Sequence, residues 1–321
     1  MTDSVTVTEL WQQAEHGNFA GVKGVNIRYC IVRAPQSRGA IVLCSGRIES
    51  YMKYWPLVQW LYDQGYSLYL WDHRGQGLSE RMLTNRHIGH VHHFRDYVAD
   101  MVKFVRERVT PDKPAQRYLL AHSMGGAIAA LYLHQYPHHF DKALLSSPMF
   151  GVQLPAPSWV ISPLLSVLHQ LRPEGYAVGG HNYRAIPFAD NDNTHDENQY
   201  RAFRQLYQDR PELQLGAPSV QWIRQALALE QQWPQIQIET PTVVAIAGAD
   251  TVVNNKAARL FAQRGQHELI CIDDAMHELL MESDDYRQPL LNRLLEWFAP
   301  QPLHDLDDAT APATHPVSEE R

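Results

Sequence analysis

A serine between an apolar segment and two glycines is the residue of this chain best placed for nucleophilic chemistry. Ser123 follows the apolar run 117–121 and precedes Gly125 and Gly126, which open an alanine-rich segment. This order is typical of a nucleophile elbow, a sharp strand-to-helix turn that exposes the serine hydroxyl and needs small neighbours. The usual pattern, G-x-S-x-G, has glycine where this chain has Ala121, which is small enough for the same turn. The pattern also occurs in structural turns, so its interpretation depends on partners elsewhere.

A serine hydroxyl is a weak nucleophile, so it needs a base to accept its proton and an acid to orient that base. In hydrolases with an elbow, the acid and then a histidine follow the serine in the sequence. Asp250 follows the apolar run 242–247, and His277 follows the run 268–272. Parallel strands that end at one sheet edge would bring such residues together. We therefore predict that Ser123, Asp250 and His277 form a catalytic set.

Other residues near these positions are alternatives. The chain has 17 histidines, and most histidines are surface or core residues, so only its place after the last predicted strand distinguishes His277. Asp250 could be a simple turn acid, with Asp273 or Asp274 orienting the histidine instead. Those two precede His277 so closely that the chain would have to fold back, which favours Asp250. His122 is interpreted as a packing residue, because neighbours along an elbow point away from each other.

Attack on an ester carbonyl creates a negative oxygen that needs hydrogen-bond donors. The backbone N–H of Met124 is one expected donor, because it follows the nucleophile and begins a helix. The second expected donor is the N–H of Arg47, in the loop after the apolar run 40–44. The Arg47 side chain could also reach a substrate phosphate, although an ion pair with Glu49 is the simpler interpretation. This chemistry needs neither a metal nor an organic cofactor, and we expect none.

Composition and charge exclude several other classes of function. The chain has 321 residues and a net charge of −7, which argues against nucleic acid as a partner. Its polar first residues predict no signal peptide, and no apolar run is long enough to cross a membrane. The three cysteines are widely spaced and predict reduced thiols rather than a disulfide or zinc site. We expect a cytoplasmic protein, with peripheral contact to the inner face of the membrane as an open alternative.

Short apolar runs alternate with longer helical patterns, which predicts an α/β fold with a mostly parallel central sheet and helices on both faces. The predicted strands are 25–32, 40–44, 67–71, 117–121, 143–146, 242–247 and 268–272. The predicted helices are 55–64, 94–108, 124–135 and 286–298. The glycines of the loop 72–77 match no dinucleotide-binding pattern, so we interpret it as a structural turn held by Asp72 and Arg74.

The strand pattern stops after residue 148 and resumes near residue 236. We predict a core formed by residues 1–148 and 236–300, a helical cap or lid at 149–235 and a disordered tail at 301–321. A cap helix should begin with Ser162 as its N-cap and Pro163 as its first residue. Its apolar stripe could pack on the core or line an acyl pocket. The candidate substrate-binding residues, taken from this helix and from the segment before it, are Met149, Phe150, Trp159, Leu164 and Leu168. Aromatic residues that could extend this wall are Tyr183, Phe188, Tyr200, Phe203 and Trp222.

Several motifs together resemble one known family. They are the segments 45–50, 72–77, 121–126, 147–151 and 276–278. In combination they are similar to the monoacylglycerol-lipase-like branch of the α/β-hydrolases, which includes lysophospholipases, over about residues 20–298. The resemblance implies an α/β-hydrolase fold with the helical cap inserted after the sixth strand. It also implies that Ser123 is the nucleophile, Asp250 the acid and His277 the base.

The same resemblance implies a substrate class. It predicts release of a fatty acid from a lysophospholipid or monoacylglycerol through an acyl-enzyme intermediate, with acyl transfer between such lipids left open. The chain departs from the family where Ala121 replaces the first elbow glycine and where Ser45 stands in place of a histidine. The alternatives are a short-chain carboxylesterase or thioesterase with the same triad, or a silent scaffold that binds a small hydrophobic ligand. Oligomeric state, head group and chain length stay open.

Overall fold

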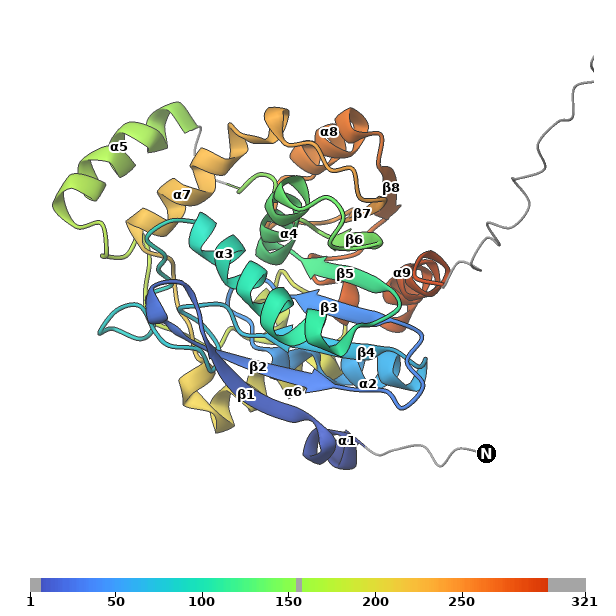
Figure 1. Cartoon of the computed structure of the whole chain (residues 1–321). Helices are drawn as coiled ribbons and strands as arrows, with labels where there is room; N and C mark the ends of the chain where they lie inside the picture. The colour runs from blue at the N-terminus through green and yellow to red at the C-terminus, as the bar shows by residue number, and fades with distance from the viewer. Residues whose placement is uncertain (1–6, 154–157, 300–321) are drawn as a thin grey trace, which may run out of the picture.

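The computed structural model describes residues 7–153 and 158–299, without the side chains of residues 7 and 158–160. The predicted tail and the polar start of the chain lie outside these ranges. The described residues form an eight-stranded sheet of order β1-β2-β4-β3-β5-β6-β7-β8 (Figure 1). Its strands are β1 (Glu15–Ala20), β2 (Asn26–Val32), β3 (Ala40–Cys44), β4 (Ser67–Trp71), β5 (Arg117–His122), β6 (Lys142–Ser146), β7 (Thr242–Ala247) and β8 (Glu268–Ile272).

The sheet is parallel except at one edge. β1 pairs antiparallel with β2, and β2 pairs antiparallel with β4, whereas all pairs from β4 to β8 are parallel. β3 and β7 are buried along their whole length, as expected for strands covered on both faces. The seven predicted strands and the mostly parallel sheet are confirmed. β1 was missed because it is a polar edge strand in which only Phe19 is buried.

Helices cover both faces of the sheet, as predicted. One apolar core contains residues of α3 (Arg95–Phe104), α4 (Met124–Gln135) and α8 (Asn255–Gly265). The other contains residues of α1 (Val7–Gln13), α2 (Trp55–Asp63) and α9 (Asp284–Trp297). Successive residues of β3 alternate between these two cores, which follows from the two-residue period of a strand. The predicted helix 94–108 is α3 continued by a π-helix, η3 (Val105–Val109).

The described part of the segment between β6 and β7 consists of helices joined by loops. It contains α5 (Ser158–Leu171), α6 (Glu197–Asp209) and α7 (Val220–Glu230), and α5 packs against α7 (Figure 1). The predicted start of the cap helix is wrong, because α5 begins at Ser158 and contains Pro163 in its second turn. Proline there removes one hydrogen bond, which the helix tolerates near its end. The short 3-10 helices are η1 (Val22–Gly24), η2 (Tyr51–Tyr54), η4 (Thr110–Asp112), η5 (Phe188–Asp190), η6 (Pro211–Leu213), η7 (Trp233–Gln235) and η8 (Leu279–Met281).

Two buried acids hold the loop after β4, which is a structural turn as predicted. The Asp72 carboxylate accepts hydrogen bonds from the backbone N–H groups of Tyr51 and Leu78, each at 2.6 Å. Arg74 does not pair with Asp72. Its guanidinium binds the carboxylate of Asp100 in α3 at 2.6 Å. The turn is therefore bonded both to the loop after β3, through Tyr51, and to helix α3.

The junction of β5 and α4 leaves no room for a side chain at Gly125. A Cβ atom there would collide with the carbonyl oxygens of Cys44 and Ser45. We therefore expect Gly125→Ala to lower the free energy of unfolding by about 1–3 kcal/mol, because backbone atoms cannot move aside cheaply. Urea denaturation measures this. Gly265→Ala in α8 is the matched control, since its Cβ would meet the His267 side chain, which can rotate away. Equal stability of the two variants would contradict the prediction.

Candidate active site

Ser123 stands at the sharp turn between β5 and α4. Its backbone has φ 52° and ψ −119°, a conformation rare for residues other than glycine. The turn is held because the Ser123 N–H donates to the Ser146 carbonyl at 3.0 Å, while the Ser123 carbonyl accepts from the N–H groups of Gly126 and Met149 at 2.9 Å. These bonds attach the strained turn to the edge of the sheet. The predicted elbow is present, with Ala121 where the usual pattern has its first glycine.

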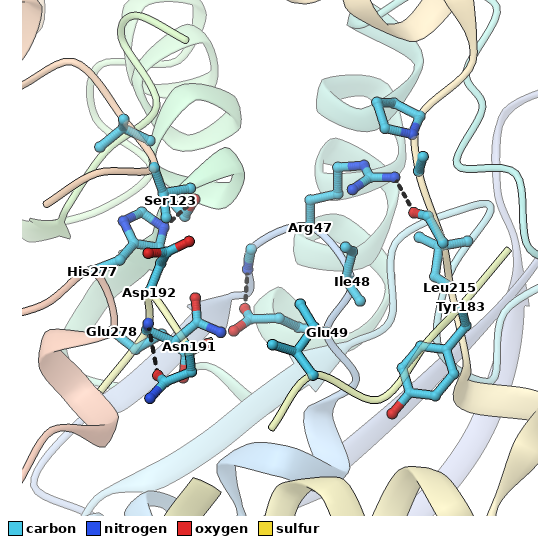
Figure 2. Close-up of a pocket in the computed structure, with 18 of the residues that line it drawn as sticks. Arg47, Ile48, Glu49, Ser123, Tyr183, Asn191, Asp192, Leu215, His277 and Glu278 are labelled. Carbon is cyan, nitrogen blue, oxygen red and sulfur yellow. Dashed lines mark hydrogen bonds between the residues drawn. The ribbon is translucent and has the colours of Figure 1, made fainter. Parts of the chain in front are cut away.

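The structure brings the three predicted residues into one hydrogen-bonded chain. Nε2 of His277 lies 2.9 Å from Oγ of Ser123, and Nδ1 of His277 lies 2.7 Å from Oδ2 of Asp250. Figure 2 shows the His277 ring directed at Ser123 from the loop after β8. All three side chains are buried. With Asp250 ionised, Nδ1 donates to the carboxylate and Nε2 is free to accept the serine proton.

Asp250 keeps its charge in this buried position. Burial raises the pKa of its carboxyl, but the hydrogen bond from His277 and two backbone N–H groups outweigh burial and lower it. Those amides belong to Val252 and Val253, which donate to Oδ1 at 2.8 and 3.0 Å. The alternative acid Asp273 instead accepts a hydrogen bond from the Cys271 thiol. The geometry therefore favours Asp250 as the partner of His277.

His122 is a packing residue in the structure. Its ring lies 4.9 Å from the His277 ring between centroids and is buried. Burial lowers the pKa of His122 to about 3, so its imidazole is neutral at physiological pH.

The loop after β3 presents the N–H of Arg47 on a peptide plane that is held from several sides. Gln76 donates to the carbonyl of Gly46 at 2.7 Å, in the same peptide group as the Arg47 N–H. Gly46 donates its own N–H to the Glu49 carboxylate. Ile48 has φ 65°, and its carbonyl accepts a hydrogen bond from the Tyr207 hydroxyl of α6 at 2.8 Å. Sequence reasoning missed Gln76, whose role depends on two loops meeting.

The expected ion pair between Arg47 and Glu49 is wrong. The Arg47 guanidinium donates to the carbonyl of Gly216 at 2.6 Å and lies 5.3 Å from the centroid of the Trp222 ring. Figure 2 shows this side chain extending away from Glu49. Glu49 pairs instead with Lys53, which is four residues along the chain and reaches it at 2.7 Å. Arg47 thus links its loop to the segment between β6 and β7, and burial lowers its pKa to about 10.

A buried cluster joins the loop of Arg47 to the loop of His277. Nζ of Lys53 lies 2.7 Å from a Glu49 carboxylate oxygen and 2.6 Å from one of Glu278, the residue after His277. The Tyr54 hydroxyl donates to Glu49 at 2.6 Å. Burial raises the pKa of Glu49, but Lys53 outweighs burial and lowers it, so the carboxylate stays ionised. No sequence motif pointed to this cluster.

Glu282 holds the other side of the His277 loop. Its carboxylate is buried and accepts the N–H of Met276 at 2.9 Å and the N–H of His195 at 2.8 Å. Nδ1 of His195 lies 2.7 Å from the same carboxylate. The residue before His277 is therefore tied to the segment that precedes α6. Sequence reasoning missed Glu282 as well.

A cavity of about 490 Å³ opens onto Ser123 and His277. Of the predicted substrate-binding residues, Met149 lines it. Phe150 does not, because its ring packs against Phe261 and Trp233 in the core, with centroids 4.1 and 4.8 Å away. The aromatic residues that do line the cavity are Tyr183, Tyr200, Phe203 and Trp222.

The predicted role of α5 in the pocket is not supported by its orientation. Leu164 is exposed and Leu168 is half-buried, and neither lines the cavity. Leu165 is the buried leucine of this helix, so the face turned inward is one residue away from the predicted one. The Trp159 side chain lies outside the described residues. Periodicity indicated an apolar stripe correctly but could not indicate which way that stripe faces.

Within the described ranges, no group of three or more His, Cys, Asp or Glu side chains is arranged to hold a metal ion. The three cysteines are free thiols. In the same part of the chain, no helix combines the length and the apolar character needed to cross a membrane.

Comparison with known proteins identifies the family. The sequence matches the family Hydrolase_4, described as serine aminopeptidase, S33, over residues 35–284. The chain belongs to this family. It is 37% identical over 305 residues to lysophospholipase L2 of Escherichia coli (strain K12), covering 91% of this chain and 89% of that protein. It is 31% identical over 162 residues to a monoacylglycerol lipase of Mycolicibacterium smegmatis, covering 50% of this chain and 55% of that protein.

Solved structures show the same fold. A soluble variant of monoglyceride lipase from Saccharomyces cerevisiae, in complex with a substrate analog, aligns with a TM-score of 0.70 at 19% identity. The alignment covers 88% of this chain and 93% of that one. The predicted α/β-hydrolase fold, with helices inserted after the sixth strand, is confirmed, as is the family resemblance given by the motifs.

Glu282 should give the folded protein a pH-dependent contribution to stability. Burial raises its pKa, but the hydrogen bonds from Met276, His195 and Ser283 outweigh burial and lower it. A lowered folded-state pKa stabilises the fold above the unfolded pKa and loses this contribution as pH falls. We expect Glu282→Gln to reduce the free energy of unfolding at pH 7, with the difference from wild type shrinking below about pH 4. Urea denaturation across pH measures it.

The control for this series is Glu107→Gln, which alters a carboxylate in a solvent-exposed pair with Arg106. It should leave stability nearly unchanged at every pH, because exposed ion pairs contribute little. A Glu282→Gln difference that stays constant from neutral to acid pH would contradict the prediction.

Proposed function

We propose that this protein is a serine hydrolase that cleaves the carboxylic ester of a lysophospholipid or monoacylglycerol and releases a fatty acid. The observation that carries the proposal is the hydrogen-bonded chain from Ser123 through His277 to Asp250. The similarity to a lysophospholipase and to a monoacylglycerol lipase supports the lipid ester as substrate. Residues 149–235 would form the cap over a core made of 1–148 and 236–300.

In the proposed mechanism, Nε2 of His277 takes the proton of Ser123 as Oγ attacks the ester carbonyl carbon. The N–H groups of Met124 and Arg47 hold the negative oxygen of the tetrahedral intermediate. The imidazolium, oriented by Asp250, gives its proton to the alcohol oxygen, and the bond to the alcohol breaks. His277 then takes a proton from water, whose oxygen attacks the acyl carbon. The imidazolium returns this proton to Oγ of Ser123 as the bond between Oγ and the acyl carbon breaks, which releases the fatty acid.

Part of the cavity lining is apolar and suits an acyl chain. Its apolar residues include Met149, Val152, Trp222, Ile223, Val252 and Val253. Each methylene group buried against such residues contributes about 0.8 kcal/mol to binding. The same cavity is also lined by charged and hydroxyl groups, among them Lys53, Glu278 and Tyr183. A molecule with one apolar tail and one polar head fits such a mixed lining.

Ser123→Ala should abolish turnover while leaving the fold intact. We expect turnover of 1-oleoyl lysophospholipid or 1-oleoylglycerol to fall about a millionfold, as removal of a triad serine does in other enzymes. Labelling by a fluorophosphonate probe should also disappear, because only an activated serine reacts. Ser166→Ala, which changes an exposed serine of α5, is the control and should keep both signals. Unchanged labelling of Ser123→Ala would refute the role of this residue.

The same assays decide between the proposal and its alternatives. Greater turnover on p-nitrophenyl acetate or a thioester than on either long-chain lipid would favour the carboxylesterase or thioesterase. Absence of labelling in the wild type would favour the silent scaffold. We expect the long-chain lipids to be the better substrates, because the apolar part of the cavity lining can bury their chains.

We further propose a cytoplasmic protein whose cap makes peripheral contact with a membrane surface. Three apolar residues lie on the outer face of α5 at spacings of three and four, and they are exposed to 47%, 58% and 77%: Leu164, Val167 and Leu171. A row of exposed apolar side chains on a surface helix suits insertion into the headgroup region of a bilayer. This contact would place the cap beside the aggregated lipid that supplies the substrate.

Replacing Leu164, Val167 and Leu171 together with glutamine tests this contact. We expect binding to phosphatidylethanolamine–phosphatidylglycerol vesicles, measured by co-sedimentation, to weaken about tenfold or more, because apolar burial in the interface is lost. Hydrolysis of a water-soluble short-chain ester should stay unchanged, since these side chains lie outside the cavity. Leu260→Gln on α8 changes another exposed leucine and is the control. Equal vesicle binding by all variants would exclude α5 as the contact.

A further inference from the structure

Two cations of the cavity wall flank one aromatic ring. Nζ of Lys53 lies 4.9 Å from the centroid of the Phe203 ring, and Cζ of Arg204 lies 4.8 Å from the same centroid. Both residues line the cavity that opens onto Ser123. They differ in how their charges are compensated. Lys53 contacts the carboxylates of Glu49 and Glu278, so its charge is more than balanced.

Arg204 has no carboxylate within ion-pair distance in the part of the chain that the structure describes. Its guanidinium donates to the Tyr200 hydroxyl at 2.7 Å and the Tyr183 hydroxyl at 3.4 Å, both neutral acceptors. Its Nε is buried and has no hydrogen-bond partner among the described residues. The other arginines at this helix are different, since Arg201 pairs with Glu197 and Arg210 pairs with Glu212. Arg204 is thus a positive charge left over in the cavity wall.

The surroundings of Arg204 keep this charge in one orientation. The guanidinium carbon lies 4.7 Å from the Tyr200 ring centroid as well as 4.8 Å from that of Phe203. Two rings and two phenol oxygens restrict the rotation of the side chain and exclude water from part of it. A planar guanidinium held in this way can bind phosphate oxygens with little loss of side-chain entropy. A substrate anion would supply the compensation that the protein itself does not provide.

The other charged groups of the cavity do not offer the same site. Arg184 also lines the cavity, but it is exposed, so water already compensates its charge. The Arg47 guanidinium is engaged by the Gly216 carbonyl and by Trp222. Asp192 and Glu278 line the cavity near His277, where they would repel an anion (Figure 2). In a lysophospholipid the glycerol backbone separates the phosphate from the acyl ester. The phosphate partner therefore has to be a cation of the cavity wall that does not contact Ser123, and Arg204 meets this condition.

We propose that Arg204 binds the phosphate diester of the substrate's head group and makes the enzyme prefer lysophospholipid to monoacylglycerol. The proposal rests on the proposed function and names the substrate feature that the cavity selects. Arg204 contacts the head group and not the reacting ester, so it determines specificity and takes no part in proton transfer. A neutral monoacylglycerol has no group to match this charge.

The test compares two substrates with the same acyl chain, 1-oleoyl lysophosphatidylethanolamine and 1-oleoylglycerol. For Arg204→Gln we expect kcat/KM on the phospholipid to fall at least about tenfold, mainly through KM, because charge-assisted hydrogen bonds are lost. On the monoacylglycerol it should stay within about threefold of wild type, since no such bond forms there. Arg204→Lys keeps the charge and should recover part of the phospholipid activity. Arg201→Gln, on the same helix, is the matched control and should change neither.

Three results would overturn the proposal. If Arg204→Gln lost the same activity on both substrates, the role of Arg204 would be structural. If Arg204→Gln kept wild-type kcat/KM on both substrates, Arg204 would have no role. If Arg204→Gln removed inhibition of monoacylglycerol hydrolysis by inorganic phosphate but left kcat/KM on the phospholipid unchanged, the site would bind free anions and not the head group. Failure of the proposed function is recognised separately, because the wild type would then hydrolyse neither lipid or would not react with the fluorophosphonate probe.

Discussion

The hydrogen bond between His277 and Ser123 is the interaction on which the rest of this structure depends. Ser123 follows β5, Asp250 follows β7 and His277 follows β8, so three strands must end at the same edge of the sheet. Parallel pairing from β5 through β8 ensures this. β6 and β7 lie between the serine strand and the histidine strand, however, so the loop after β8 has to reach back across two strands.

Buried charges hold that loop in place. Glu282 binds the amide before His277, and Lys53 binds the carboxylate after it. A buried charge is costly unless it is paired and hydrogen-bonded, so each of these groups stabilises the fold only when the loops adopt the observed arrangement. Such a cluster therefore contributes more to the position of the loops than to the overall free energy of unfolding. This explains why ionised side chains surround an imidazole whose position has to be accurate to within a hydrogen bond.

Residues with a local signature could be predicted from the sequence, and residues that act through distant contacts could not. The apolar runs predicted seven strands, and the order of elbow, acid and histidine predicted Ser123, Asp250 and His277 as partners. β1 was not predicted, because a polar edge strand lacks an apolar run. Lys53, Gln76 and Glu282 were not predicted because each has a partner far along the chain, and a single polar or charged residue is usually interpreted as a surface group. The predicted pairing of Arg47 with Glu49 was wrong because Lys53, four residues away, takes that carboxylate, while Arg47 donates to the distant carbonyl of Gly216.

The segment between β6 and β7 does more than cover the core. Tyr207 of α6 donates to the carbonyl of Ile48, and Arg47 donates to the carbonyl of Gly216, so two neighbouring residues of the loop beside Ser123 are bonded to it. Ile48 has a strained backbone, which such bonds help to maintain. The same segment supplies Tyr183, Phe203 and Trp222 to the cavity wall. Substitutions that move α6 would therefore change the cavity wall and the position of the Arg47 amide together, because one segment contacts both.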